Sequence, residues 1–195
     1  MNAYKNSRRE DYIEIIDAKV KSDWSHFGGE NNDRGETVHY IELELDDATA
    51  DFLNENEFNV RMWVPKDNQK DPVKHLKVRL PFYLPETNKD WLNSKVYIVS
   101  MDKPTVKTPM EHGMWKELDD SIIDHANLIL RLYKGRTRTG TPFKTAQLVT
   151  GTFYTSGTRV RDFEPDYDRD HQTPTVVPSS YKAETSDFDD DVVPF

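Results

Sequence analysis

Three segments of the chain alternate apolar and polar side chains with a period of two, and this pattern constrains the fold more than any other feature. The segments are Phe58–Val64, His75–Leu84 and Asn127–Tyr133. Because successive side chains of a strand point to opposite faces, each segment offers one face to a core and one to solvent. The residues expected to point inward are Phe58, Val60, Met62, Val64, Leu76, Val78, Leu80, Phe82, Leu84, Leu128, Leu130 and Leu132.

The first 160 residues are predicted to be mainly β. The expected strands are Tyr12–Val20, Val38–Leu45, Phe58–Val64, His75–Leu84, Lys95–Met101, Asn127–Tyr133 and Lys144–Tyr154. The expected short helices are Ala48–Asn54, Thr87–Leu92 and Trp115–Asp124. Seven strands separated by turn residues favour a closed or nearly closed barrel over a βαβ sheet.

Charge divides the chain near residue 160. Of the net charge of −9, residues 161–195 carry −7, from ten acidic and three basic side chains, which leaves −2 for residues 1–160. The C-terminal segment also has four prolines, no glycine and few apolar residues. Such a segment buries too little surface to offset the entropy of ordering. We therefore expect one domain over residues 1–160 and a disordered acidic tail over residues 161–195.

The composition also indicates a cellular compartment. The chain has no cysteine and no apolar run of membrane-spanning length, and its first ten residues are polar. Disulfides and cysteine-based zinc sites are therefore excluded, and neither a signal peptide nor a membrane span is expected. We therefore expect the protein in the reducing cytoplasm.

The solvent faces of the three alternating segments combine cations with aromatic rings. The residues are Arg61, Trp63, Lys77, Arg79, Tyr83, Arg131 and Tyr133. Single-stranded nucleic acid is bound by this combination, since bases stack on aromatic rings and phosphates attract cations. In the alternative interpretation, the three aromatic residues cover a second small core under a helix.

A basic stretch accompanies the last two predicted strands. Residues 126–161 contain seven basic side chains and no acidic one. Within this stretch, residues 134–143 are rich in Gly, Thr and Arg and are predicted to form a hairpin turn. We expect Arg136 and Arg138 at the turn, with Lys144 in the following strand, to contact a phosphate backbone.

The chain ends on an acidic and apolar segment. It consists of Asp187, Phe188, Asp189, Asp190, Asp191, Val192, Val193, Pro194 and Phe195. An aromatic ring beside a block of carboxylates suits a partner pocket with an apolar floor and a Lys/Arg rim. The alternative is a charged tail that only keeps the protein soluble.

This ending resembles the acidic C-terminal tip of bacterial single-stranded DNA-binding proteins, with two valines where the bacterial form commonly has one apolar residue before Pro-Phe. The resemblance covers nine of 195 residues. It implies that the nine residues recruit partner proteins. Together with the predicted barrel and basic hairpin, it implies an OB-fold and a divergent, phage-type single-stranded DNA-binding protein. The resemblance also implies that the cytoplasm is that of a bacterial or phage-infected cell.

The expected partners are therefore single-stranded DNA and, through the tip, proteins of replication and recombination. No enzymatic activity, cofactor, metal or membrane partner is expected, and a homo-oligomer is left open. The alternative function is a DNA-processing enzyme, such as a Mg²⁺-dependent nuclease, that carries a similar tail. In that case Asp120 and Asp124 would share one face of the predicted helix and hold the cation.

Overall fold

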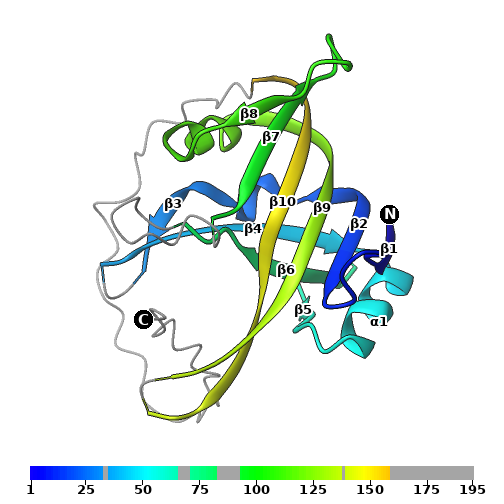
Figure 1. The fold of residues 1–195 in the computed structure, drawn as a ribbon, viewed down its shortest axis with the longest axis vertical. Helices are drawn as coiled ribbons and strands as arrows, with labels where there is room; N and C mark the ends of the chain where they lie inside the picture. Colours follow the sequence, from blue (N-terminus) through cyan, green and yellow to red (C-terminus); the bar gives the residue numbers. More distant parts are fainter. Residues whose placement is uncertain (33–34, 66–70, 83–92, 138, 159–195) are drawn as a thin grey trace.

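The computed structural model describes residues 1–32, 35–65, 71–82, 93–137 and 139–158, and these residues form a mainly β structure (Figure 1). The strands are β1 (Asn2–Lys5), β2 (Tyr12–Val20), β3 (His26–Asn31), β4 (Thr37–Leu45), β5 (Arg61–Trp63), β6 (Val73–Arg79), β7 (Lys95–Ser100), β8 (Thr108–Met110), β9 (Ser121–Arg136) and β10 (Pro142–Thr158). The helical elements are the 3-10 helix η1 (Ser22–Trp24), the α-helix α1 (Asp47–Glu55) and the 3-10 helix η4 (His112–Leu118).

Five of the strands close into a ring. They follow the order β6, β4, β2, β9 and β10, and every neighbouring pair in this order is antiparallel. The ring closes through a short parallel pairing of β10 with β6, in which Ala146 lies opposite Val78 and Gln147 opposite Arg79. A closed five-stranded ring is the OB-fold architecture that the sequence predicted.

The remaining strands extend this ring. β1 pairs with β2, β3 with β4 and β5 with β6. The far half of β10 leaves β6 and pairs with β7, which in turn pairs with β8. The β9–β10 hairpin is the longest pairing, running from Ser121 opposite Thr158 to Arg136 opposite Pro142, and its turn projects beyond the ring at the lower left of Figure 1.

The core fills the inside of the ring, as the period-two alternation predicted. Leu76 and Val78 of β6 and Leu128 and Leu130 of β9 are at most 1% exposed. They pack with other buried residues: Ile13, Ile15, Phe27, Ile41, Leu43, Leu148 and Phe153. Burial of these side chains is the main term that stabilises the closed ring.

The inward prediction is wrong for two residues of the Phe58–Val64 segment. Phe58 is buried, but Met62 and Val64 are 59% and 64% exposed. Only Arg61–Trp63 of this segment forms a strand, and it pairs with β6 outside the five-stranded ring. The side of β5 that was predicted to point inward, which carries Met62, therefore does not face the core. Leu84 lies outside the described residues.

The predicted helix Ala48–Asn54 is confirmed as α1. Its N-cap is Asp46, whose side chain accepts a hydrogen bond from the backbone N–H of Thr49 at 2.7 Å. The predicted helix Trp115–Asp124 is wrong, because η4 ends at Leu118 and β9 begins at Ser121. The β-branched residues Ile122 and Ile123 favour this strand. The predicted helix Thr87–Leu92 lies outside the described residues.

Strands β1, β3 and β8 were not predicted, whereas β9 and β10 are longer than the predicted segments. Within the described residues, no helix is long and apolar enough to span a membrane.

Candidate nucleic-acid interface

The outer face of β4 and β6 carries charged and aromatic side chains. The register places Tyr40 opposite Arg79, Glu42 opposite Lys77 and Glu44 opposite His75. The intervening residues of both strands point into the core. This outer face, together with η1, β3 and β5 beside it, is called the β4–β6 face below.

Two tryptophan rings meet at the edge of the β4–β6 face. Trp24 of η1 lies 5.5 Å from the ring of Trp63 in β5 and 5.4 Å from the ring of His75, both in edge-to-face geometry. Lys21 places its Nζ 4.9 Å from the Trp24 ring. Trp63 is 41% exposed, so part of its ring is available to a ligand. A half-exposed indole beside a cation suits base stacking.

Tyr40 is a second aromatic residue of this face, but it is largely covered. The Nζ of Lys77 lies 3.6 Å from the centre of its ring, and the His26 ring packs against it at 5.1 Å. Its hydroxyl donates to Glu30 at 2.6 Å. Tyr40 therefore positions the Lys77 ammonium on the surface and offers little ring area of its own.

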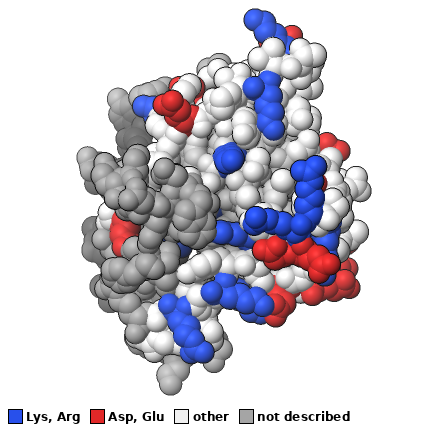
Figure 2. Space-filling view, viewed as in Figure 1, with Lys and Arg blue, Asp and Glu red and all other residues white. Residues whose placement is uncertain are grey.

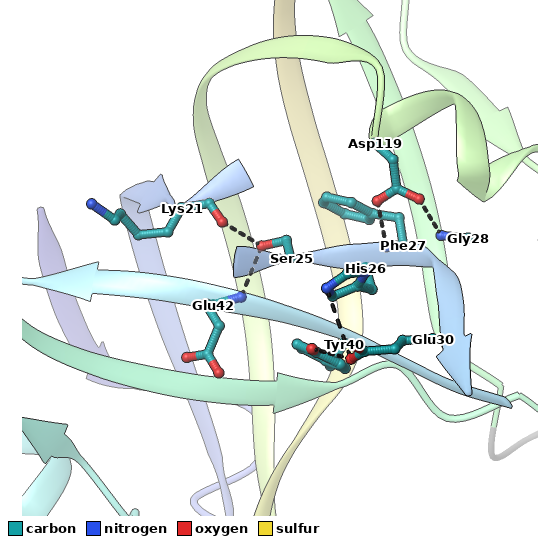
Figure 3. A network of polar contacts seen from close by, with 9 residues as sticks. All are labelled: Lys21, Ser25, His26, Phe27, Gly28, Glu30, Tyr40, Glu42 and Asp119. Carbon is teal, nitrogen blue, oxygen red and sulfur yellow. Dashed lines mark hydrogen bonds and ion pairs between the residues drawn. The ribbon is translucent and has the colours of Figure 1, made fainter. Parts of the chain in front are cut away.

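A polar network joins η1 and β3 to β4 (Figure 3). The Ser25 hydroxyl donates to the Lys21 carbonyl at 2.8 Å and accepts from the Glu42 backbone N–H at 2.9 Å. The Lys21 N–H donates to the Glu42 carbonyl at 2.8 Å. These bonds hold the segment that carries Trp24 against the ring.

Asp119, which follows η4, fixes the middle of β3 (Figure 3). Its carboxylate accepts from the backbone N–H groups of Phe27 and Gly28, both at 2.7 Å. The β3–β4 ladder is interrupted between His26 and Glu30, so these N–H groups find their partner outside the ladder. A Cβ on Gly28 would lie 2.7 Å from the Lys116 Cβ, and this close approach explains the glycine.

Two carboxylates on the β4–β6 face are already paired with basic groups. Glu42, 7% exposed, lies 2.8 Å from His75 Nδ1. Glu44 contacts Lys19 and also Lys21, at 3.2 Å, and these hydrogen bonds hold the pKa of Glu44 below its usual range. The two lysines reduce the repulsion that Glu44 would exert on a phosphate backbone.

The face continues across the closing pair of the ring onto β10 and β9. Arg131 donates from Nε and from one terminal nitrogen to Gln147 Oε1, at 3.0 and 2.7 Å, and Gln147 lies opposite Arg79. Further along the hairpin, the rings of Tyr133 and Phe143 lie 5.9 Å apart. They cover Gly135, where a Cβ would come within 2.4 Å of the Phe143 ring.

The opposite side of the hairpin carries lysines that are held by one carboxylate. Glu57, which follows α1, pairs with Lys134 and with Lys144, the latter at 3.0 Å. These two ammonium groups hold the pKa of Glu57 at about 2. Lys144 therefore lies on the other side of the hairpin from Tyr133 and is already paired.

Figure 2 shows the surface over β7, β9 and β10 from the same direction as Figure 1. Lys and Arg side chains are spread over it from top to bottom, and the largest acidic group lies at the right, toward β1 and α1. Basic side chains are therefore spread over this surface although the chain is acidic overall.

The residues predicted to bind DNA therefore fall into groups according to their place in the fold. Arg61, Trp63, Lys77 and Arg79 share the β4–β6 face, and Arg131 and Tyr133 follow along β9. Arg136 is exposed near the turn, where it donates to the Gly140 carbonyl at 3.2 Å. Tyr83, Arg138 and the nine residues of the C-terminal tip lie outside the described residues.

Sequence reasoning missed Trp24, Lys21, Tyr40 and His75. Tyr40 and His75 could have been found, because both alternate with the buried residues of strands that were predicted. Trp24 had no such signal, since it lies in a short 3-10 helix between two strands.

The carboxylate arrangement expected for a nuclease is not formed. Asp120 precedes β9 and Asp124 lies within it, so they do not share a helix face. In the described part of the chain, no group of three or more His, Cys, Asp or Glu residues could hold a metal ion.

The ring and its outer face define an OB-fold with a cationic and aromatic surface. No protein-family model and no curated protein sequence matches the chain. Among solved structures, it is similar to a single-stranded DNA-binding protein from bacteriophage Enc34, with a TM-score of 0.53 and 10% identity over 85% of this chain and 91% of that one. The same phage protein in complex with single-stranded DNA aligns with a TM-score of 0.51 and 10% identity, over 80% and 91% of the two chains. The single-stranded DNA-binding protein gp2.5 of bacteriophage T7 aligns with a TM-score of 0.36 and 11% identity, over 80% and 96%.

Proposed function

We propose that this protein binds single-stranded DNA without sequence preference and coats it during replication and recombination. The observation that carries the proposal is the β4–β6 face, where Trp24 packs against Trp63 with Lys21 beside it, and where Lys77 lies over the Tyr40 ring. In OB-folds, this part of the ring and the loops beside it bind oligonucleotides. The shared fold with a phage protein solved in complex with single-stranded DNA supports the same function.

Binding would use stacking and charge, with no cofactor. Bases would stack on the exposed part of Trp63 and on the Tyr133–Phe143 pair, both of which present π-faces that accept any base. The cations Arg61, Lys77 and Arg79 would follow the phosphates on the β4–β6 face. None of these contacts reads base edges, so we expect little sequence preference.

The C-terminal segment would have a separate role. We propose that its tip, Asp187–Phe195, recruits replication and recombination proteins through an apolar and acidic contact. The resemblance of these nine residues to the bacterial tip supports this role. The −7 charge of residues 161–195 also suits competition with DNA for the basic surface.

A gel-shift comparison of single-stranded DNA, duplex DNA and RNA of equal length tests the binding function. We expect a shift of single-stranded DNA at protein concentrations that leave the duplex free. In the presence of Mg²⁺ the labelled strand should remain intact, and its shortening would indicate a nuclease. Equal binding of the duplex would contradict the proposal.

The role of the tip is tested independently with Phe195→Ala in the full chain. This variant should bind DNA as the parent does, because the ring has no base to stack on in this proposal. It should fail to capture replication proteins that the parent retains from extract, because the apolar anchor is lost. Unchanged capture would contradict the recruiting role and leave the DNA-binding proposal standing.

A further inference from the structure

A buried glutamine lies where the five-stranded ring closes. Gln147 of β10 stands opposite Arg131 of β9 on one side and opposite Arg79 of β6 on the other. Its sequence neighbours Ala146 and Leu148 belong to the core, so Gln147 points to the outer side of the ring. It is nevertheless only 7% exposed. A polar side chain that points outward and is still buried must be covered by other parts of the chain.

Arg131 is hydrogen-bonded to this glutamine. Its Nε and one terminal nitrogen donate to Oε1 of Gln147, at 3.0 and 2.7 Å. One oxygen thus holds one edge of the planar guanidinium, and the arginine keeps its full charge because the amide is neutral. The other terminal nitrogen is not used by Gln147, and its N–H groups suit the oxygens of a phosphate.

The register brings a second arginine to the same place. β9, β10 and β6 are neighbours at this point, and paired strands lie about 4.8 Å apart. The Cα atoms of Arg131 and Arg79 are therefore separated by about 10 Å, so these long side chains can reach toward one stretch of backbone. The row continues to Tyr40 of β4 and Tyr12 of β2, and none of its five members is acidic.

We propose that Arg79 and Arg131 clamp the phosphate backbone of single-stranded DNA where it crosses from β6 to β9, and that Gln147 positions this clamp. The inference rests on the proposed function, because it takes single-stranded DNA as the ligand. Arginine suits this task, since its planar fork matches two phosphate oxygens at once. A guanidinium already held by a neutral partner loses less side-chain entropy on binding than a mobile one.

A substitution that changes little but charge separates this role from a structural one. Gln147→Glu keeps the size of the side chain and an oxygen for Arg131, but its carboxylate cancels the charge that a phosphate needs. The thermal midpoint should stay close to that of the parent. The slope of log affinity against log salt should become shallower by about 0.7, the value of one single-strand contact, so the loss of affinity between 50 and 200 mM salt shrinks about 2.6-fold.

If Gln147 only fastens β9 to β10, Gln147→Glu should keep the slope of the parent, and that result would overturn the positioning role. Asn54→Asp is the matched control, because it adds the same charge at an exposed position of α1. We expect it to have the slope of the parent. An equal change of slope in both variants would mean that the added charge acts from a distance and not through Arg131.

Removal of the acceptor tests whether Gln147 acts through Arg131. Gln147→Met is neutral and of similar length but cannot accept from the guanidinium, and Arg131→Met removes the guanidinium itself. Both variants should bind single-stranded DNA more weakly than the parent, and the double variant should bind no more weakly than Arg131→Met alone. Unchanged affinity in Gln147→Met, or additive losses in the double variant, would contradict the coupling.

A measurement on the unaltered chain guards against misfolded variants. Nitrogen NMR of the arginine side chains should show the Nε signals of Arg79 and Arg131 shifting on addition of oligodeoxythymidine. The same oligonucleotide with neutral methylphosphonate linkages should leave both signals unchanged, because it offers no anionic oxygen. Equal shifts with both ligands, or no shift with either, would overturn the clamp. If the parent still binds DNA in that case, the proposed function stands, whereas failure of the parent to bind would contradict the function itself.

Discussion

At the edge of the β4–β6 face, the adjacent residues Met62 and Trp63 point to opposite sides of β5, so substitutions of single residues can be compared. Trp63 packs against Trp24, whereas Met62 is 59% exposed on the other side of β5. We expect Trp63→Ala to weaken binding of single-stranded DNA by about 1–3 kcal/mol, the cost of one lost stacked base. Met62→Ala should leave the affinity unchanged. Fluorescence anisotropy with a labelled oligonucleotide measures both, and equal effects of the two variants would remove Trp63 from the interface.

Glu57 provides a second test at this scale, because its carboxylate neutralises two lysines of the hairpin. Glu57→Gln should free Lys134 and Lys144 for phosphates, and each new contact steepens the salt dependence of single-strand binding by about 0.7. Glu55→Gln changes the same charge at the end of α1 and should leave the slope unchanged. Affinities at several salt concentrations give both slopes, and the prediction fails if the slope of Glu57→Gln equals that of the parent.

The effect of Glu57→Gln should not vary near neutral pH. The pKa of Glu57 is lowered to about 2, so its pairing is fully present above about pH 4.5 and is lost only as the pH falls through about 2. The difference between variant and parent should therefore be the same at pH 6 and pH 8. A difference that disappears between these values would show that another group controls the lysines.

At the scale of elements, β3 depends on a side chain from outside its sheet. Asp119→Ala would leave the N–H groups of Phe27 and Gly28 without their acceptor. Because hydrogen bonds to charged groups contribute about 1.5–3 kcal/mol, the free energy of unfolding should fall by at least about that amount. DNA affinity should also fall, since β3 follows directly on η1, which carries Trp24.

Chemical denaturation of Asp119→Ala and of Glu117→Ala, a variant of an exposed neighbour, measures the loss. Amide hydrogen exchange should show faster exchange at Phe27 and Gly28 in Asp119→Ala alone. Equal stability of the two variants would mean that Asp119 does not hold β3.

The same elements show how far the sequence predicts this fold. Strands with one buried face, such as β6 and the central part of β9, were predicted from alternation of apolar and polar residues. The apolar residues, Leu76 and Val78 in β6 and Leu128 and Leu130 in β9, are the ones that the structure buries. β3 was missed because its ladder is interrupted and its N–H groups bond to Asp119, far away in sequence. A hydrogen bond between residues so far apart in the sequence cannot be predicted from the local sequence pattern.

The candidate interface was also only partly predictable from the sequence. Trp63 in β5 and Lys77 and Arg79 in β6 were predicted because each alternates with apolar residues along its own strand. Lys144 was predicted from its charge alone, and its ion pair with Glu57 could not be foreseen because the two residues are 87 positions apart. Pairing of distant charges is a tertiary effect that composition does not reveal.

At the scale of the whole molecule, binding of single-stranded DNA should depend strongly on salt concentration. If about four phosphates are neutralised, an increase from 50 to 200 mM salt should lower affinity for single-stranded DNA roughly 50-fold. Filter binding at a series of salt concentrations measures this slope. A slope near zero would show that phosphates are not bound.

The division of charge along the chain predicts the effect of a truncation. Ending the chain after residue 160 removes a segment with a net charge of −7. If that segment competes with DNA, the truncated protein should bind more tightly than the full chain, and the gain should be largest at low salt, where screening is weakest. Weaker binding after truncation would make the segment part of the DNA site.

Photo-cross-linking shows whether single-stranded DNA lies on the β4–β6 face. A single-stranded oligonucleotide containing bromodeoxyuridine is irradiated in complex with the full chain, and the modified residues are identified by mass spectrometry. We expect cross-links at Trp63 and Trp24, followed by Tyr133 and Phe143 on the hairpin. Cross-links confined to aromatic residues outside this path, such as Tyr4 of β1 or Tyr97 of β7, would contradict it.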